Sequence, residues 1–204
     1  AYMPFHSDPT DRVGLFCVQK AKSGGLSSIA SSVAIYNEIL AARPQALDCL
    51  FRGFHYSLRG EADGGIGAIT EYRVPVFDYF AGKLSSRYVR KTIEQAATIG
   101  GAPLDAGEIA ALDILDALAV RDDLRFDMSF EPGDIQYLNN HVSFHSRTGF
   151  EDDADPALRR HLMRIWLQSA DARALSPVMS RPHGAKSAFL SREQALAREA
   201  QAVA

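Results

Sequence analysis

The chain has 204 residues, 47% of them hydrophobic, which is enough apolar material to bury the core of one globular domain over 1–204. The net charge of −3 and the pI near 6.1 argue against nucleic acid as a partner, because surfaces that bind phosphate backbones are basic. No apolar run reaches the length of a membrane span and no secretory signal is visible, so we expect no membrane partner and a cytoplasmic location. Cys17 and Cys49 lack metal-type spacing, and we interpret them as reduced, buried thiols.

Apolar periodicity and turn residues divide the chain into short strands with helices between them. Ser31 or Ser32 is placed to cap the first helix. The apolar face of this helix is expected to carry Val33, Tyr36 and Leu40. In chain order, the expected elements are a strand at 12–20, a glycine turn at 22–28, helices ending near 42 and covering 46–51, a strand pair at 54–59 and 69–77, helices at 85–101 and 105–123, strands at 124–130, 134–140, 141–147 and 159–168, and a helical tail at 191–204.

The two helices in the middle of the chain have recognisable ends. The first runs from a serine cap at Ser85 or Ser86 to a Gly-Gly stop, and the second opens with Asp105 and Glu108 at capping-box spacing. We therefore expect a helical insertion at about 85–121. Because strands precede and follow it, the pattern predicts an α+β chain, mainly β, whose sheets form a sandwich or jelly roll.

The opening segment AYMPFHSDPT contains a candidate pair of metal ligands, His6 and Asp8, two residues apart. With six histidines in the chain, one His-x-Asp pair arises by chance about as often as not. The pair alone therefore does not establish a site.

A second block with chemistry lies at 133–167, where His145 precedes Arg160 and Arg164. If 159–167 is a strand, the two arginines share one face, with their Cα atoms roughly 13 Å apart. A guanidinium among apolar neighbours needs an anionic partner, and this strand holds no acidic residue. A carboxylate ligand, which arginine can bind through two parallel hydrogen bonds, is one way to supply that partner.

Two imidazoles and one carboxylate on one face of an octahedral metal leave three positions open, the arrangement of non-haem Fe(II) oxygenases. The blocks FHSD, AKSGG, NNHVSFHSRTGFED and RRHLMRIWL occur here in that order. Together they resemble the taurine dioxygenase/2,4-dichlorophenoxyacetate dioxygenase (TauD/TfdA-like) family of Fe(II)- and 2-oxoglutarate-dependent oxygenases. The resemblance covers most of the chain, and the last two blocks are its most specific part.

The resemblance implies a double-stranded β-helix (jelly roll) core, Fe(II) as metal, and 2-oxoglutarate and O₂ as cosubstrates. It implies a role for six residues: His6, Asp8 and His145 as iron ligands, Arg160 at the distal carboxylate of 2-oxoglutarate, Ser27 as a hydroxyl residue that helps hold the same cosubstrate, and Arg164 at an anionic substrate or the cosubstrate. The loop from His145 to Arg160 is long, so the roles of Arg159, Arg160 and Arg164 have to be assigned by geometry.

The implied reaction is hydroxylation or desaturation of an unactivated C–H bond of a small molecule, with release of succinate and CO₂. Arg164 gives a mild preference for an anionic substrate. The alternatives are a cupin-like metal enzyme without 2-oxoglutarate, a hydrolytic zinc enzyme, and a non-catalytic or inactive truncated jelly-roll binding protein. A homo-oligomer is left open, with the helical insertion as one surface for it.

Only five residues precede His6, whereas members of this family carry a substantial segment there. We therefore expect that sequence upstream of the ligand pair is missing. That segment contributes outer strands and part of the substrate pocket in the family.

Other polar residues of the same block have less specific interpretations. Arg147 is interpreted, by a small margin, as a structural partner of Asp152 or Asp153 rather than a substrate contact. Asn139 and Asn140 are expected to satisfy backbone groups at a turn or strand end.

Overall fold

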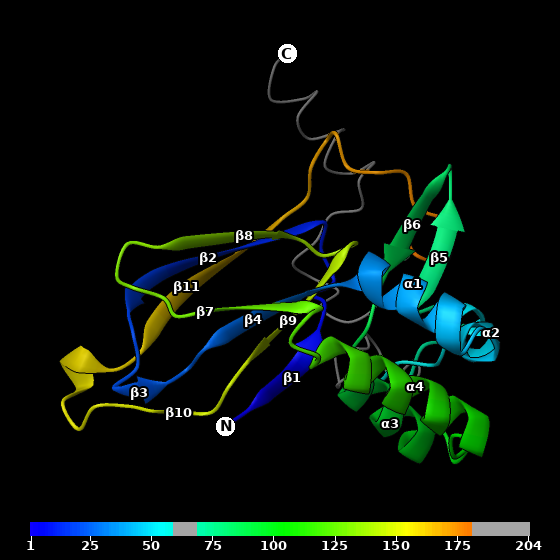
Figure 1. Ribbon diagram of the computed structural model, residues 1–204, viewed down its shortest axis with the longest axis horizontal. Helices are drawn as coiled ribbons and strands as arrows, with labels where there is room; N and C mark the ends of the chain where they lie inside the picture. Colours follow the sequence, from blue (N-terminus) through cyan, green and yellow to red (C-terminus); the bar gives the residue numbers. More distant parts are fainter. Residues whose placement is uncertain (59–68, 181–204) are drawn as a thin grey trace.

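A computed structural model describes residues 1–58 and 69–180, which form a mixed fold of helices and sheets in which strands predominate (Figure 1). The strands are β1 (Met3–His6), β2 (Arg12–Gln19), β3 (Ser23–Gly24), β4 (Ser27–Ser31), β5 (Phe77–Phe80), β6 (Lys83–Ser86), β7 (Arg125–Met128), β8 (Ile135–Asn139), β9 (Ser143–Arg147), β10 (Phe150–Glu151) and β11 (His161–Leu167). The helices are α1 (Ser32–Ala42), α2 (Gln45–Arg52), α3 (Arg90–Ile99) and α4 (Ala106–Ala119), with a 3₁₀ turn, η2, at Pro156–Leu158.

The strands form two main antiparallel sheets. One has the order β1-β9-β4-β7 and the other has the order β11-β2-β8. Two short pairs, β10-β3 and β5-β6, complete the pairing. The β10-β3 pair lies at the end of the sheets away from the helices (Figure 1). The strands expected at 12–20, 124–130, 134–140, 141–147 and 159–168 are all present in this arrangement.

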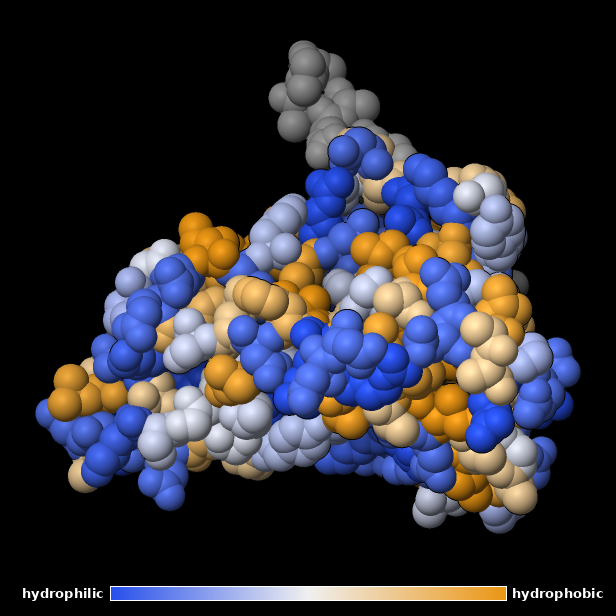
Figure 2. Space-filling model, viewed as in Figure 1, coloured by the Kyte–Doolittle hydropathy of each residue, from blue (hydrophilic) through white to orange (hydrophobic). Residues whose placement is uncertain are grey.

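The three-stranded sheet has one buried and one exposed face. Side chains directly opposite across its strands share a face, and Val13, opposite Leu138, is buried together with Cys17. The other face leaves large apolar side chains in solvent, namely Phe16, Val18, Ile135, Tyr137, Met163, Ile165 and Leu167. Apolar residues are visible between hydrophilic ones over much of the face drawn in Figure 2. The buried face is therefore the one that can contribute to an internal site.

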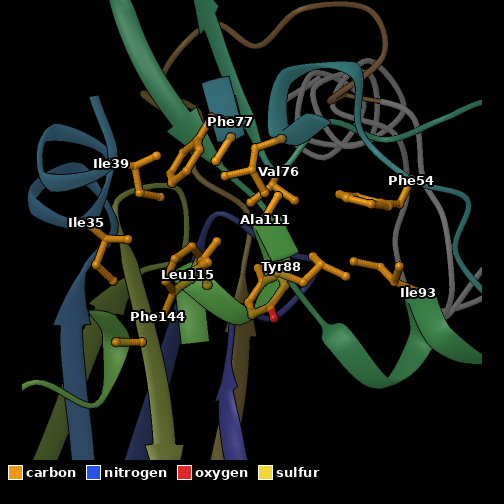
Figure 3. Close-up of a cluster of buried hydrophobic side chains, with 14 of the residues drawn as sticks. Ile35, Ile39, Phe54, Val76, Phe77, Tyr88, Ile93, Ala111, Leu115 and Phe144 are labelled. Carbon is orange, nitrogen blue, oxygen red and sulfur yellow. The ribbon is translucent and has the colours of Figure 1, made fainter. Parts of the chain in front are cut away.

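The hydrophobic core lies between the helices and the four-stranded sheet (Figure 3). Ile35 and Ile39 of α1, Leu115 of α4 and Phe144 of β9 are all fully buried within it, close to Tyr88. The helices α1, α2 and α4 pack against one another, so they form one layer over the end of the sheet.

The first helix has the predicted cap but only part of the predicted face. Ser31 is the N-cap, and its hydroxyl accepts a hydrogen bond from the main-chain N–H of Ala34. Ile35 and Ile39 are the buried apolar residues of this helix, and Tyr36 packs against the core beside them, whereas Leu40 is exposed, so the predicted face was only partly right. Apolar residues surround most of this helix, and periodicity therefore could not choose between its faces.

Two further expectations required correction. The helix expected from residue 85 begins at Arg90, because residues 83–86 are instead a strand of the β5-β6 hairpin. Val89 is its N-cap, without a side-chain hydrogen bond, so the serine cap was wrong. The strand pair expected at 54–59 and 69–77 is reduced, over the described residues, to two isolated bridges. The helical tail expected at 191–204 lies outside the described residues.

No helix in the described ranges has the length and apolar character needed to cross a bilayer.

The capping box of α4 provides a test of how this helix is anchored. The Asp105 carboxylate accepts from the Glu108 N–H at 2.8 Å, and the Glu108 carboxylate accepts in return from the Asp105 N–H at 3.1 Å. We predict that Asp105→Ala lowers the free energy of unfolding by about 0.5–2 kcal/mol in urea titrations. Asp105→Asn retains an acceptor oxygen and should lie within a few tenths of a kcal/mol of the parent. Equal stability of the two variants would contradict the capping role.

Candidate metal centre

Pairing of β1 with β9 brings the two predicted histidine ligands together. His6 ends β1 and lies directly opposite His145 in the register of the sheet. Their ring centroids are 4.3 Å apart. Residues 139 positions apart in sequence therefore become neighbours through main-chain hydrogen bonding alone.

Asp8 is held beside these rings by the turn that leaves β1. Its main-chain N–H donates to the Oδ1 of Asn140 at 3.1 Å, and both residues are buried. Ser7 exchanges hydrogen bonds with Tyr88: its N–H donates to the Tyr88 carbonyl at 2.9 Å, and its hydroxyl accepts from the Tyr88 N–H at 3.0 Å. The predicted role of Asn140 in satisfying a backbone group is confirmed, and the group is that of the candidate ligand.

The three side chains form a donor set with unpartnered atoms. One ligand atom from each of His6, Asp8 and His145 lies within 4.8 Å of the others. Oδ2 of Asp8 and Nδ1 of His145 are buried without a hydrogen-bond partner among the described residues. Nε2 of His145 is 3.7 Å from Oδ2 of Asp8. Nδ1 of His6 is bonded to the Pro4 carbonyl at 2.9 Å, which makes Nε2 the nitrogen that this ring can offer to a metal. Two nitrogens and one oxygen suit a divalent first-row metal, so the site fits one.

Burial keeps both imidazoles in the metal-binding form. Burial is the main cause that lowers the pKa of His6 below its usual value. For His145, burial first, and then the nearby His6 and Arg164, lower the pKa to about 3. A neutral imidazole has the lone pair that a metal bond requires, and both rings are therefore neutral near pH 7.

The predicted residue Arg164 lies against the metal site rather than apart from it. Its Nη1 is 3.4 Å from Oδ1 of Asp8, and its guanidinium stacks on the Trp166 ring at 4.5 Å. The side chain is about half exposed. Arg164 can thus balance the charge of Asp8 while its outer side faces the cavity described below.

Ser27 and Arg160 lie near the strand ends at β3 and β10. The Ser27 hydroxyl is buried and bonded to the Gln136 amide, with atom separations of 3.2 and 3.3 Å. Arg160 precedes β11, and its guanidinium lies 5.0 Å from the centroid of the Phe150 ring. Burial, followed by the charge of Arg147, lowers the pKa of Arg160. By contrast Arg159 is exposed, and its Nε donates to the Asp153 carbonyl, so it points away from this region.

A cavity of about 530 Å³ opens beside the triad, and His6 and Asp8 form part of its wall. Its other walls are mainly apolar or cationic, and Asp8 is the one acidic residue of the described chain that lines it. The cationic side chains in the lining are Arg87, Arg90, Lys91, Arg147 and Arg164.

Sequence reasoning missed two features of this region. Gln136 reaches Ser27 from the opposite sheet, and its only signal was a polar residue at an inward position of a strand. Arg147 does not bind Asp152 or Asp153 as expected. Its guanidinium contacts the main-chain carbonyls of Ala1 and Thr148 and lies 4.5 Å from the Phe150 ring centroid.

Comparison with solved structures defines the class of fold. The structure is similar to asparagine oxygenase in complex with Fe(II), 2S,3S-3-hydroxyasparagine and succinate, with a TM-score of 0.63 at 20% identity, over 82% of this chain and 50% of that one. It is also similar to the non-haem iron oxygenase OrfP in complex with Fe and alpha-ketoglutaric acid, with a TM-score of 0.57 at 16% identity, over 82% and 50% of the two chains. The fold is therefore that of non-haem iron oxygenases.

Sequence comparison then identifies the family. The model of the taurine catabolism dioxygenase TauD, TfdA family matches residues 3–166, and the chain belongs to that family. The predicted resemblance is confirmed.

Curated relatives support the same assignment. FR-33289 synthase of Streptomyces rubellomurinus is 33% identical over 87% of this chain and 53% of its own length. Taurine hydroxylase-like protein SAT17 of Stachybotrys chartarum is 34% identical over 81% and 42%. Uridine-5'-phosphate dioxygenase of a Streptomyces species is 30% identical over 74% and 53%. The chain spans about half the length of the curated relatives that it matches.

The lowered pKa of His145 predicts a pH dependence for the metal-free protein. Because the unfolded chain takes up this proton near pH 6.5 and the folded chain only near 3, the stabilisation is complete above pH 6.5 and is lost as the pH falls between these values. This histidine should contribute a slope of up to about 1.4 kcal/mol per pH unit. Denaturant titrations from pH 6.5 to 4.5 should give a smaller slope for His145→Asn than for the parent. Identical slopes would contradict the burial of a neutral ring.

Proposed function

We propose that this protein is an Fe(II)- and 2-oxoglutarate-dependent dioxygenase that hydroxylates, or desaturates, an unactivated C–H bond of a small anionic molecule, releasing succinate and CO₂. The observation that carries the proposal is the buried set of His6, Asp8 and His145, which leaves donor atoms unpartnered in a chain of the TauD/TfdA family. The two facing sheets support the jelly-roll core that we infer for it.

Within this proposal, each residue of the triad has a physical role. His6 and His145 present neutral nitrogens, and Asp8 supplies the negative charge that partly balances a divalent ion. Bound iron and 2-oxoglutarate supply the activation of O₂, a chemistry that no protein side chain provides. Arg164, in contact with Asp8, holds the carboxylate in one orientation from the cavity side.

The cosubstrate role of Ser27 and Arg160 is supported by their common location. Both lie near the β10-β3 end of the sheets, and Gly25, two residues before Ser27, adjoins the Arg160 side chain there, since a Cβ on it would lie 3.4 Å from the Arg160 Nε. A dicarboxylate that reaches from the triad to this end would find a guanidinium and a hydroxyl at its far carboxylate.

The cavity supports a small anionic substrate. Its volume of about 530 Å³ suits a small molecule, and its lining combines apolar walls with cationic side chains. The name of one relative, uridine-5'-phosphate dioxygenase, includes a phosphorylated small molecule, which is consistent with an anion in the corresponding place.

The direct test is the consumption of O₂ coupled to conversion of 2-oxoglutarate into succinate. We predict that Asp8→Ala lowers this activity by more than about 100-fold, since loss of an outer-shell partner alone costs about 10–100-fold. Asp122→Ala removes an exposed carboxylate distant from the site and should retain full activity.

Four results would argue against the proposal. Full activity of Asp8→Ala would refute the ligand assignment. Metal-dependent turnover without 2-oxoglutarate would favour a cupin-like enzyme, and turnover without O₂ would favour a hydrolase. Absence of metal binding in the folded parent protein would leave a binding protein as the better description.

A further inference from the structure

Arg147 lies at the same end of the sheets as the inferred cosubstrate residues. It is two residues after His145 on β9, so the two side chains leave the same face of the strand. It is also directly opposite Ser27 of β4, and side chains opposite each other in an antiparallel pair share a face. That face is the inner one, because the Ser27 hydroxyl bonds to Gln136 of the other sheet.

Arg147 and Arg160 approach the same aromatic ring. Their guanidinium carbons lie 4.5 and 5.0 Å from the centroid of Phe150, the residue that pairs with Gly24 in the β10-β3 pair. The charge of Arg147 contributes to the lowered pKa of Arg160, which places the two cations within electrostatic range of each other. Two positively charged side chains therefore lie close together, both against the Phe150 ring.

Neither guanidinium has a carboxylate partner within the described part of the chain. In the described ranges, the Arg147 side chain donates hydrogen bonds to the main-chain carbonyls of Ala1 and Thr148. The nearby Asp152 carboxylate accepts from the main-chain N–H of Arg160, at 2.8 Å, rather than from its side chain. The charge of Asp152 partly offsets that of Arg160, but the two partly buried cations still repel each other, and a bound anion would relieve that repulsion.

We propose that Arg147 is a second binding residue for the distal carboxylate of 2-oxoglutarate, acting together with Arg160 and the Ser27 hydroxyl. This inference rests on the proposed function. It differs from the sequence-based expectation, in which Arg147 was a structural partner of nearby aspartates. Two guanidinium groups and a hydroxyl favour a carboxylate over an uncharged end, so Arg147 contributes to selection of a dicarboxylate cosubstrate.

The test compares two ligands that differ only at the distal end. 2-Oxovalerate has the five-carbon chain and the keto-acid end of 2-oxoglutarate but lacks the distal carboxylate. Anaerobic calorimetry with Fe(II)-loaded protein measures the dissociation constant of each ligand. We predict that Arg147→Gln weakens 2-oxoglutarate binding about tenfold or more, the usual scale of a lost charge-assisted hydrogen bond. The affinity for 2-oxovalerate should change less than about twofold, because Arg147 does not reach the keto-acid end.

Three further variants serve as controls for this measurement. Arg160→Gln should produce the same selective loss, whereas Arg159→Gln, on the exposed side of the same loop, should leave both affinities unchanged. Retained 2-oxovalerate binding in Arg147→Gln shows that the fold and the iron site are intact. Arg147→Lys, which keeps the charge, should recover part of the lost affinity.

Two outcomes overturn the inference, and they are distinguishable. If Arg147→Gln binds 2-oxoglutarate like the parent, the inference fails while the proposed function stands, and Arg147 is then assigned to the substrate cavity that it also lines. If the parent protein binds neither 2-oxoglutarate nor 2-oxovalerate in the presence of Fe(II), the proposed function fails and the inference fails with it.

Discussion

Two imidazoles and a carboxylate, brought together in the interior with donor atoms that find no hydrogen-bond partner among the described residues, are the constraint on which the rest of this molecule depends. Such groups lose their contacts with water on folding, and the free energy of that loss is offset only by hydrogen bonds within the protein or by a bound metal. The β1-β9 register brings the two imidazole rings together, and Asn140 holds the main chain of Asp8 by a hydrogen bond. The positive charge of Arg164 partly balances the negative charge of the Asp8 carboxylate. The surrounding structure thus maintains a costly arrangement that a cation would stabilise.

The second organising feature is the distribution of positive charge. Arg164 contacts the candidate ligand Asp8, whereas Arg147 and Arg160 lie against Phe150 and form no ion pair with a carboxylate in residues 1–58 and 69–180. Under the proposals made above, one arginine lies at the metal and two bind the far end of a dicarboxylate. The cavity beside the triad carries further cations, Arg87, Arg90 and Lys91, in addition to Arg147 and Arg164.

Local chemistry accounts for the parts of the fold that the sequence could predict. The caps at Ser31 and Asp105 depend on side chains a few residues from the bonds they make, and both are present. The buried face of α1 was not predictable, because nearly every face of this helix is apolar. The β5-β6 hairpin was missed although its turn at Ala81 and Gly82, both with positive φ, left a glycine as a signal.

At the candidate site, too, local sequence patterns could not predict contacts between strands that are distant in the chain. The pairing of His6 with His145 depends on a strand register across most of the chain, for which no local pattern exists, and only the family resemblance indicated it. Gln136 and Arg147 had no such signal, because their importance comes from neighbours on other strands: Gln136 faces Ser27, and Arg147 shares Phe150 with Arg160.

The most direct test of the account is the visible absorption spectrum of the protein with Fe(II) and 2-oxoglutarate in the absence of O₂. If the triad binds iron and the keto-acid end of the cosubstrate chelates it, a metal-to-ligand charge-transfer band appears when both are present and disappears when either is omitted. A folded protein that gives no such band with both components would contradict the central claim.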